Sequence, residues 1–216
     1  MASPASTDAS TSSRDKILDT AEPLFARSGF AGVGLREVAE QVGMGKSSLF
    51  HHFPSKVQLY VAVLERVFHE FDQRLELRAS QDEGPLAQLH GWATVVVGML
   101  AEHPNWAALL LRSLFEGDVI GREDQARIDV IFSRIVARIS SALQAGIASN
   151  EIRPVSIPHT IQTMVGMTVF HFASGDMGDD LLGEPIYSQP QLQARLSHLH
   201  DYIDHALATR PLDSPT

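Results

Sequence analysis

The sequence predicts an all-α protein of about nine helices, with a three-helix N-terminal domain and a larger helical C-terminal domain. Three observations support this fold class. Apolar residues recur at three- and four-residue intervals along most of the chain, as they do on the buried face of an amphipathic helix. No segment combines sustained apolar–polar alternation with hairpin turn residues, which a β-sheet would require. Gly, Pro and Asn separate the helical blocks.

The first helix follows a polar tail. Residues 1–12 consist mainly of Ser, Thr, Ala and Pro, and we expect them to be mobile. From Ser13 the apolar pattern is helical, and Gly29 provides a stop, because glycine readily adopts the left-handed conformation that ends a helix. Pro23 removes one hydrogen bond inside this helix, so we expect a local kink there without a break.

Two short helices come next, over residues 35–42 and 45–52. The small Ala39 lets them cross closely, and Gly43 supplies the positive φ that the tight turn between them needs. With Leu24 and Phe25 of the first helix, apolar side chains of this pair should form a small core: Val38, Val42, Met44, Leu49 and Phe53.

A long helix should begin at Ser55, because Pro54 ends the helix before it. Five more helical blocks follow, at residues 86–102, 105–117, 122–149, 158–174 and 190–209. We place the domain boundary after residue 57. The N-terminal domain then spans residues 13–57, and the C-terminal domain spans residues 58–216.

Composition excludes several classes of protein. The chain contains no Cys, which rules out disulfides, thiolate catalysis and Cys-ligated zinc. Its N-terminus lacks the apolar segment of a secretory signal, and the longest apolar run, residues 92–101, is about half of the roughly 20 residues that span a membrane. We therefore expect a cytoplasmic protein without membrane contact. None of the ten His is spaced with carboxylates as in a metal site, so we expect neither a metal nor a cofactor.

The net charge of −9 is distributed unevenly. Residues 1–57 contain six basic and six acidic residues, whereas the rest of the chain carries the whole negative excess. All three lysines, at positions 16, 46 and 56, lie in the first part, and no acidic residue occurs between Glu40 and Glu65. If the protein contacts phosphate groups, this stretch is the one that does so, because the acidic part would be repelled.

The outer side of the helix at 45–52 carries Lys46, Ser47, Phe50 and His51. Such a helix fits the major groove of DNA, where Lys and Ser donate to base edges and phosphates and Phe contacts a thymine methyl. The pattern alone leaves a second interpretation open, in which the pair of helices is an ordinary helical hairpin with a solvated polar face.

Residues 29–59, GFAGVGLREVAEQVGMGKSSLFHHFPSKVQL, and the upstream ILDTAEPLFARSGF closely resemble the N-terminal signature of the TetR family of bacterial transcriptional regulators. The strongest matches are Leu24-Phe25, Gly29-Phe30, Val38-Ala39, Val42-Gly43, Leu49-Phe50 and Phe53-Pro54-Ser55-Lys56. The resemblance implies that residues 45–52 form the recognition helix. One departure is Gly34, which stands where the family commonly has a capping Thr or Ser, so this cap is weaker.

The resemblance also implies which side chains contact DNA. Residues facing bases or nearby phosphates would be Lys46, Ser47, Ser48, Phe50 and His51. Arg36, on the preceding helix, matches a position that reaches the groove or the backbone. His52 and Lys56 match phosphate contacts.

The C-terminal domain resembles the family only in its helical layout. In the last helix, Leu192, Leu196, Leu199 and Ile203 form a narrow seam suited to packing against another helix. The resemblance implies that the last two helices pair across a two-fold axis into a four-helix homodimer interface. The alternative is that both helices complete the core of a monomer.

A ligand pocket is implied among the large, soft side chains of the middle helices, since Trp and Met suit apolar small-molecule pockets. The candidates are Trp92, Met99, Trp106, Leu110, Phe115, Phe132, Met164, Met167, Phe170 and His171. Each of them could instead belong to the plain core.

These features favour a ligand-responsive repressor that binds a near-palindromic operator as a dimer and is released by a small, apolar or aromatic effector. We do not expect an enzyme, because the sequence lacks a nucleophile motif, a metal-ligand His pair with Glu and a glycine-rich cofactor loop. Two alternatives are a helical enzyme acting on small molecules and a constitutive DNA-binding regulator without a ligand.

Overall fold

The computed structural model describes residues 12–79, 83–116 and 119–209. This part of the chain is all-helical and holds ten helices, with one isolated β-bridge between Ile152 and Ala208. The helices are α1 (Ser13–Gly32), α2 (Leu35–Val42), α3 (Lys46–His52), α4 (Lys56–Ala79), α5 (Pro85–Glu102), α6 (Asn105–Ser113), α7 (Arg122–Ala148), α8 (Ile157–Ala173), α9 (Asp176–Leu182) and α10 (Gln189–Leu207). The predicted fold class is confirmed, and the tail expected at residues 1–12 lies almost wholly outside the described residues.

The short helix α9 is the element that the sequence did not predict. It lies in the Gly- and Asp-rich stretch between the helical blocks predicted at residues 158–174 and 190–209. Gly175 and Gly183, with φ values of 52° and 74°, flank it as end residues. Gly178 is buried inside it, and a Cβ atom there would lie 2.2 Å from the Ser174 hydroxyl. The glycines therefore bound and pack this helix instead of preventing it.

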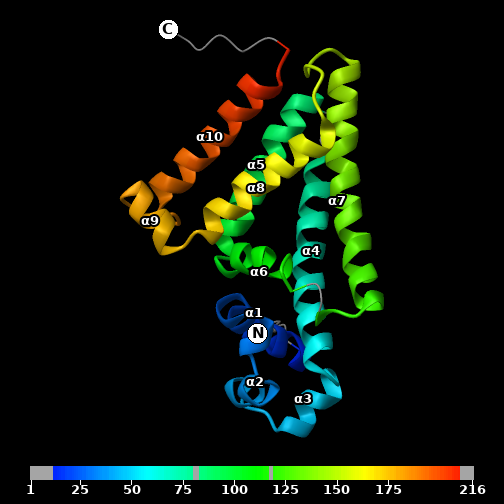
Figure 1. Ribbon diagram of the computed structural model, residues 1–216, viewed down its shortest axis with the longest axis vertical. Coiled ribbons are helices and arrows are strands. Elements are labelled where there is room, and N and C mark those ends of the chain that lie inside the picture. The colour runs from blue at the N-terminus through cyan, green and yellow to red at the C-terminus, as the bar shows by residue number, and fades with distance from the viewer. Residues whose placement is uncertain (1–11, 80–82, 117–118, 210–216) are drawn as a thin grey trace, which may run out of the picture.

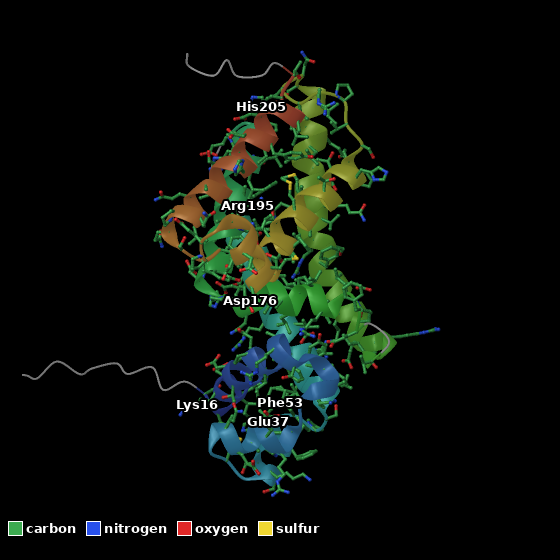
Figure 2. All side chains as sticks on the ribbon, turned by 60° about the vertical axis from the view of Figure 1, so that its left-hand side comes forward. Lys16, Glu37, Phe53, Asp176, Arg195 and His205 are labelled. Atoms are coloured by element: carbon green, nitrogen blue, oxygen red, sulfur yellow. The ribbon has the colours of Figure 1, made fainter. Side chains whose placement is uncertain are left out.

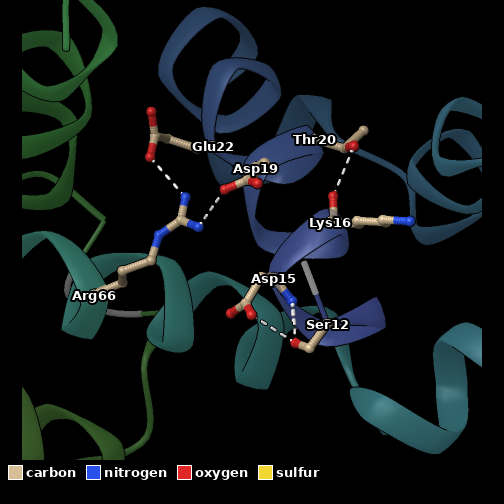
Figure 3. Close-up of polar contacts among 7 residues, drawn as sticks. All are labelled: Ser12, Asp15, Lys16, Asp19, Thr20, Glu22 and Arg66. Atoms are coloured by element: carbon tan, nitrogen blue, oxygen red, sulfur yellow. Dashed lines mark hydrogen bonds and ion pairs between the residues drawn. The ribbon is translucent and has the colours of Figure 1, made fainter. Parts of the chain in front are cut away.

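Helix α1 begins as its sequence indicates. The Ser12 hydroxyl accepts the Asp15 N–H at 3.1 Å (Figure 3), which satisfies one of the free donors at the helix start. The backbone leaves the helical conformation at Gly29, where φ is 67° and ψ is 176°. Gly29 is the one described residue of α1 with non-helical dihedral angles, so Pro23 does not break the helix, as predicted.

Helices α2 and α3 form the expected tight pair below α1 in Figure 1. Gly43 ends α2 in the left-handed conformation, with φ 77° and ψ 32°. Val38, Ala39, Leu49 and Phe53 are buried and pack in one cluster with the apolar residues of α1. We refer to α1–α3 as the head and to α4–α10 as the body.

Helix α4 joins the two parts. It starts beside α3 and runs far into the body, where it packs along α5 and α7 (Figure 1). Near the head, Arg66 of α4 forms ion pairs with Asp19 at 2.5 Å and Glu22 at 2.8 Å, both on α1 (Figure 3). The remaining body helices close around α4 and α5, with α8 against α6 and α7 and α10 against α5.

Helix α7 is long and apolar enough, by length and composition, to cross a membrane. In the structure it packs along α4 instead. Arg134 and Arg138 of α7 pair with the buried carboxylate of Asp72 on α4, at 3.0 and 3.1 Å. These ion pairs fix one side of α7 against the central helix.

Candidate DNA-binding surface and effector cavity

Helix α3 lies at the end of the head that is farthest from most of the body (Figure 1). Its Leu49 side chain is fully buried and anchors the helix, while Phe50 is 36% exposed. Lys46, Ser47, Ser48 and His51 are exposed. The Lys46 ammonium lies 5.4 Å from the centre of the Phe50 ring and has no carboxylate partner among the described residues. The structure thus presents this predicted set together on one protruding surface.

Arg36 is also exposed, on α2. Its Nε donates to Glu40 Oε1 at 3.0 Å, one turn further along the same helix. The side chains are 84% and 67% exposed. An ion pair this exposed contributes little free energy, so Arg36 can exchange Glu40 for a phosphate group at small cost.

Lys56 has a different environment from the one predicted. Its Nζ donates to the carbonyl oxygens of Phe30, at 2.8 Å, and Val33, at 3.0 Å, and lies 4.3 Å from the centre of the Phe30 ring. The chain leaving α1 needs donors for its free carbonyls, and Lys56 supplies them. Lys56 therefore fastens the α1–α2 connection to the first turn of α4, while His52, predicted with it, is half-buried beside His51.

A network that the sequence did not predict joins the head to the body. Glu116, after α6, accepts the Phe30 N–H at 2.8 Å with one carboxylate oxygen and the Tyr60 hydroxyl at 2.6 Å with the other. Tyr60 is fully buried and packs edge-on against Phe25 and Phe30. Burial and then the Glu116 carboxylate raise the pKa of the Tyr60 phenol far above its usual range.

Arg112 completes this network from the last turn of α6. Its Nε donates to the Ala26 carbonyl at 2.9 Å and its Nη2 to the Arg27 carbonyl at 3.1 Å. These are carbonyls of the last turn of α1 before Gly29, which lack helical partners. A Cβ atom at Gly29 would lie 2.7 Å from the Glu116 carboxylate, so a glycine is needed here both for its positive φ and for this close approach.

Within the body, six helices line a partly open cavity of about 140 Å³. The residues that line it are Phe68, Phe71, Leu75, Leu89, Trp92, Ala93, Val96, Leu100, Leu110, Phe132, Ile135, Ile139, Met164, Val165, Met167, Thr168, Val169, Leu199 and Ile203. None of these side chains is charged. Thr168 has the one hydroxyl among them, and it donates to the Met164 carbonyl at 2.8 Å. The Trp92 indole N–H donates to the Leu75 carbonyl at 3.1 Å. The cavity therefore suits an apolar guest.

Half of the predicted pocket residues line this cavity, namely Trp92, Leu110, Phe132, Met164 and Met167. The other half do not. Met99 is fully buried in the core, and Trp106 packs between Phe71 and His103.

The remaining three predicted pocket residues lie on other surfaces. Phe115 and Phe170 are 81% and 56% exposed. His171 lies one turn beyond the cavity, with its ring edge-on to that of Phe172. Helix α8 is apolar on most sides, so its sequence did not show which side faces inward.

The predicted seam of α10 faces the interior of its own protomer. Leu199 and Ile203 are buried and line the cavity, while Leu192 and Leu196 are half-buried against the core. Leu199 and Ile203 thus contribute to the protomer core, while Leu192 and Leu196 keep part of their surface exposed. The exposed sides of the last two long helices carry other residues, Gln162, Thr163, Val165, Gly166 and Phe170 on α8 and Gln193, Ala194, Ser197, His198 and Asp201 on α10.

Comparisons of the sequence with known protein families match both parts of the chain. Residues 17–63 match the family model described as "Bacterial regulatory proteins, tetR family", and residues 85–203 match that described as "Tetracyclin repressor-like, C-terminal domain". The HTH-type transcriptional regulator RutR of Escherichia coli (strain K12) is 28% identical over 160 residues, which cover 73% of this chain and 72% of RutR.

Solved structures show the same fold. AibR, crystallised in complex with isovaleryl coenzyme A and operator DNA, superposes with a TM-score of 0.73 at 20% identity, covering 88% of this chain and 96% of AibR. FadR from Bacillus subtilis, in complex with stearoyl-CoA, gives a TM-score of 0.70 at 18% identity, covering 87% of this chain and 96% of FadR. The head with its protruding α3, the body with its apolar cavity and the two family matches lead to one conclusion: this chain belongs to the TetR family of bacterial regulatory proteins.

Proposed function

We propose that the protein is a ligand-responsive transcriptional repressor, which binds a near-palindromic operator as a homodimer and leaves it when a small apolar or aromatic effector enters the body. The observation that carries the DNA-binding part is the surface of α3. Leu49 anchors this helix from below, and Lys46, Ser47 and His51 project from its exposed side. Such a helix enters a major groove without rearrangement of the head.

Dimerisation is supported by the exposed sides of α8 and α10. Gly166 lies exposed in the middle of α8, where a Cβ atom would meet no neighbour, and Phe170 exposes an aromatic ring one turn further on. A glycine on an exposed helix side permits close approach of a second helix. Two heads held roughly 34–36 Å apart by this interface would reach successive major grooves of one duplex.

The effector class follows from the cavity lining, which offers apolar and aromatic surface. The AibR and FadR complexes support the proposal by analogy, because they show that this fold holds acyl-coenzyme A molecules and that one member does so with operator DNA bound.

Helix α4 provides a direct path between the two sites. Phe68, Phe71 and Leu75 of α4 line the cavity, whereas Lys56 and Tyr60 of the same helix contact the head. An effector changes DNA binding only if it favours one orientation of this helix over another. A guest in the cavity would contact apolar side chains of α4 and could meet that condition by fitting one orientation better than the other.

A gel-shift titration with DNA from the region upstream of the gene tests the proposal. Lys46→Ala should weaken specific binding by about tenfold, the value of one good base or phosphate contact. Arg122→Ala, which removes an exposed cation at the start of α7, is the matched control and should bind as the wild type does. The proposal fails if specific binding is absent at moderate salt or if Lys46→Ala binds as tightly as the control.

A further inference from the structure

The side chains of His171 and Arg195 lie one helical turn beyond the cavity, on α8 and α10, two of the helices that line it. Met167 of α8 and Leu199 of α10 line the cavity. His171 follows Met167 by four residues, and Arg195 precedes Leu199 by four residues, so each lies on the same side of its helix as a cavity-lining residue. Because α8 and α10 run in opposite directions (Figure 1), both steps lead to the same end of the cavity.

Neither side chain has its hydrogen-bonding capacity satisfied. Arg195 lies on α10 (Figure 2). It donates its Nη2 to the Met167 carbonyl on α8, but its Nε is buried without a partner. His171 Nε2 is also buried without a partner. No carboxylate of the described residues pairs with Arg195. Both nitrogens are buried within the protomer.

The electrostatics of this corner favour an anion. Burial lowers the pKa of the Arg195 guanidinium, because no negative charge compensates for the loss of water. Burial and then the Arg195 charge lower the pKa of His171 to about 4, so the imidazole is neutral at pH 7. A buried guanidinium without an anionic partner costs free energy that an incoming anion would recover.

The present bond of Arg195 is easily exchanged. The Met167 carbonyl is in the middle of α8, where it already accepts a helical hydrogen bond from the residue four positions later. A carboxylate would accept two guanidinium hydrogen bonds at once, both charge-assisted and stronger than a bond to a carbonyl.

We propose that Arg195, with His171 beside it, binds the carboxylate of an effector whose apolar body fills the cavity. This inference rests on the proposed function and narrows its effector class to small carboxylic acids. The cavity of about 140 Å³ is close to the roughly 150 Å³ of an apolar cavity that holds benzene, which sets the size of the body. The cavity lining offers a carboxylate no charged partner, so the head group has to reach Arg195.

Three probes separate the parts of this proposal: 3-phenylpropanoate, its isosteric amide 3-phenylpropanamide, and toluene. Their affinities for the purified full-length protein are measured by titration calorimetry. We expect the wild type to bind the carboxylate about tenfold more tightly than the amide, as a charge-assisted pair should. Arg195→Met, which keeps an unbranched side chain, should bind both equally and leave the toluene affinity within about twofold.

Arg153→Met is the matched control, because Arg153 likewise donates to a helix carbonyl, that of Ala206 near the C-terminal end of α10, away from Arg195. It should keep the full preference for the carboxylate. Arg195→Lys retains the positive charge but cannot donate two parallel hydrogen bonds to one carboxylate. It should keep part of the preference for the carboxylate, which provides a second readout if Arg195→Met does not fold.

The outcomes are distinguishable. Toluene binding with equal affinities for carboxylate and amide in the wild type would overturn the anion site while leaving the cavity as the effector site. A preference that persists in Arg195→Met would overturn the role of Arg195. Failure of all three probes to bind would refute both the anion site and the cavity as an effector site, while gel shifts would still test DNA binding separately.

Discussion

At the scale of single residues, the junction between head and body depends on groups that are buried and fully bonded. Tyr60 and Glu116 meet at 2.6 Å, with the Tyr60 side chain fully buried. Removing one partner of such a pair leaves the other buried without its hydrogen bond, and this costs more than the bond itself contributes.

Tyr60→Phe should therefore lower the free energy of unfolding by about 1–3 kcal/mol, because the half-buried Glu116 carboxylate loses a donor. Urea denaturation measures this change. Tyr202→Phe removes the same hydroxyl from a half-buried position on α10, where the structure shows no hydrogen bond to it, and it should stay within about 0.5 kcal/mol of the wild type. Equal effects of the two substitutions would show that Glu116 does not depend on Tyr60.

The lowered pKa of His171 predicts how the free energy of unfolding depends on pH. Its pKa of about 4 in the folded protein lies below the usual histidine value of 6.5, so the folded state resists protonation. The unfolded state binds the proton first as pH falls, and stability declines between about pH 6.5 and 4, by about 1 kcal/mol per pH unit from this group. The contribution is complete above pH 6.5.

Denaturation curves recorded between pH 4 and 7 test this dependence. His171→Phe should flatten the decline, although part of it will remain because burial also lowers the pKa of His90. His69→Phe, at an exposed position on α4, should leave the slope unchanged. A slope that is the same in wild type and His171→Phe would contradict the burial of a neutral imidazole.

At the scale of helices, the head was predictable from the sequence and much of the body was not. The interruption of α1 at Gly29 and the end of α2 at Gly43 follow from local residues, and both glycines have positive φ values. Helix α9 was missed because glycines at its ends resembled a linker. The contacts of Arg112 and Glu116 with α1 join residues more than 80 positions apart, and no local pattern carries such information.

The cavity shows the same limit. Helical periodicity places Met164 and Met167 on the cavity side of α8, but Phe170 belongs to the same apolar run and is exposed. On a helix that is apolar nearly all round, the arrangement of neighbouring helices decides which side is covered. The seam of α10 was ambiguous for the same reason, since a protomer core and a dimer interface impose one and the same spacing.

The hydrogen bonds from Arg112 of α6 to the carbonyls of α1 hold these two helices together, and hydrogen exchange should detect their loss. Arg112→Met removes both donors to the last carbonyls of α1, so the amides of α1 should exchange about tenfold faster, which is typical of a lost stabilisation of roughly 1.4 kcal/mol. The amides of α10 should be unaffected. Arg153→Met should give the reverse pattern, and uniform acceleration of exchange in Arg112→Met would indicate global destabilisation instead.

At the scale of the whole molecule, the head and the body differ in net charge, and this difference favours DNA contact by the head. The head and its tail are neutral over residues 1–57, while the remainder carries the net charge of −9. Repulsion from phosphate keeps the body off DNA and leaves contact to the head. A dimer that places two heads on one side of the assembly makes full use of this division.

The proposed dimer interface predicts the effect of a charge on the exposed side of α8. Phe170→Glu should convert the dimer into monomers of 23.6 kDa, because a carboxylate would be buried against the partner without a counter-charge. Sedimentation equilibrium measures the mass. Val130→Glu, at a similarly exposed apolar position on α7, should remain dimeric. A dimeric Phe170→Glu protein would place the interface elsewhere.

The attachment of Lys56 to the Phe30 and Val33 carbonyls has a mechanical consequence. It ties the connection between α1 and α2 to the first turn of α4, so this part of the head should follow a rotation of α4. Over the 24 residues of α4, roughly 36 Å, a tilt of about 5° displaces the far end by about 3 Å. In a symmetric dimer both heads would shift. A tilt of α4 by a few degrees in each protomer would then change the distance between the two α3 helices, so that it no longer matches the spacing of successive major grooves.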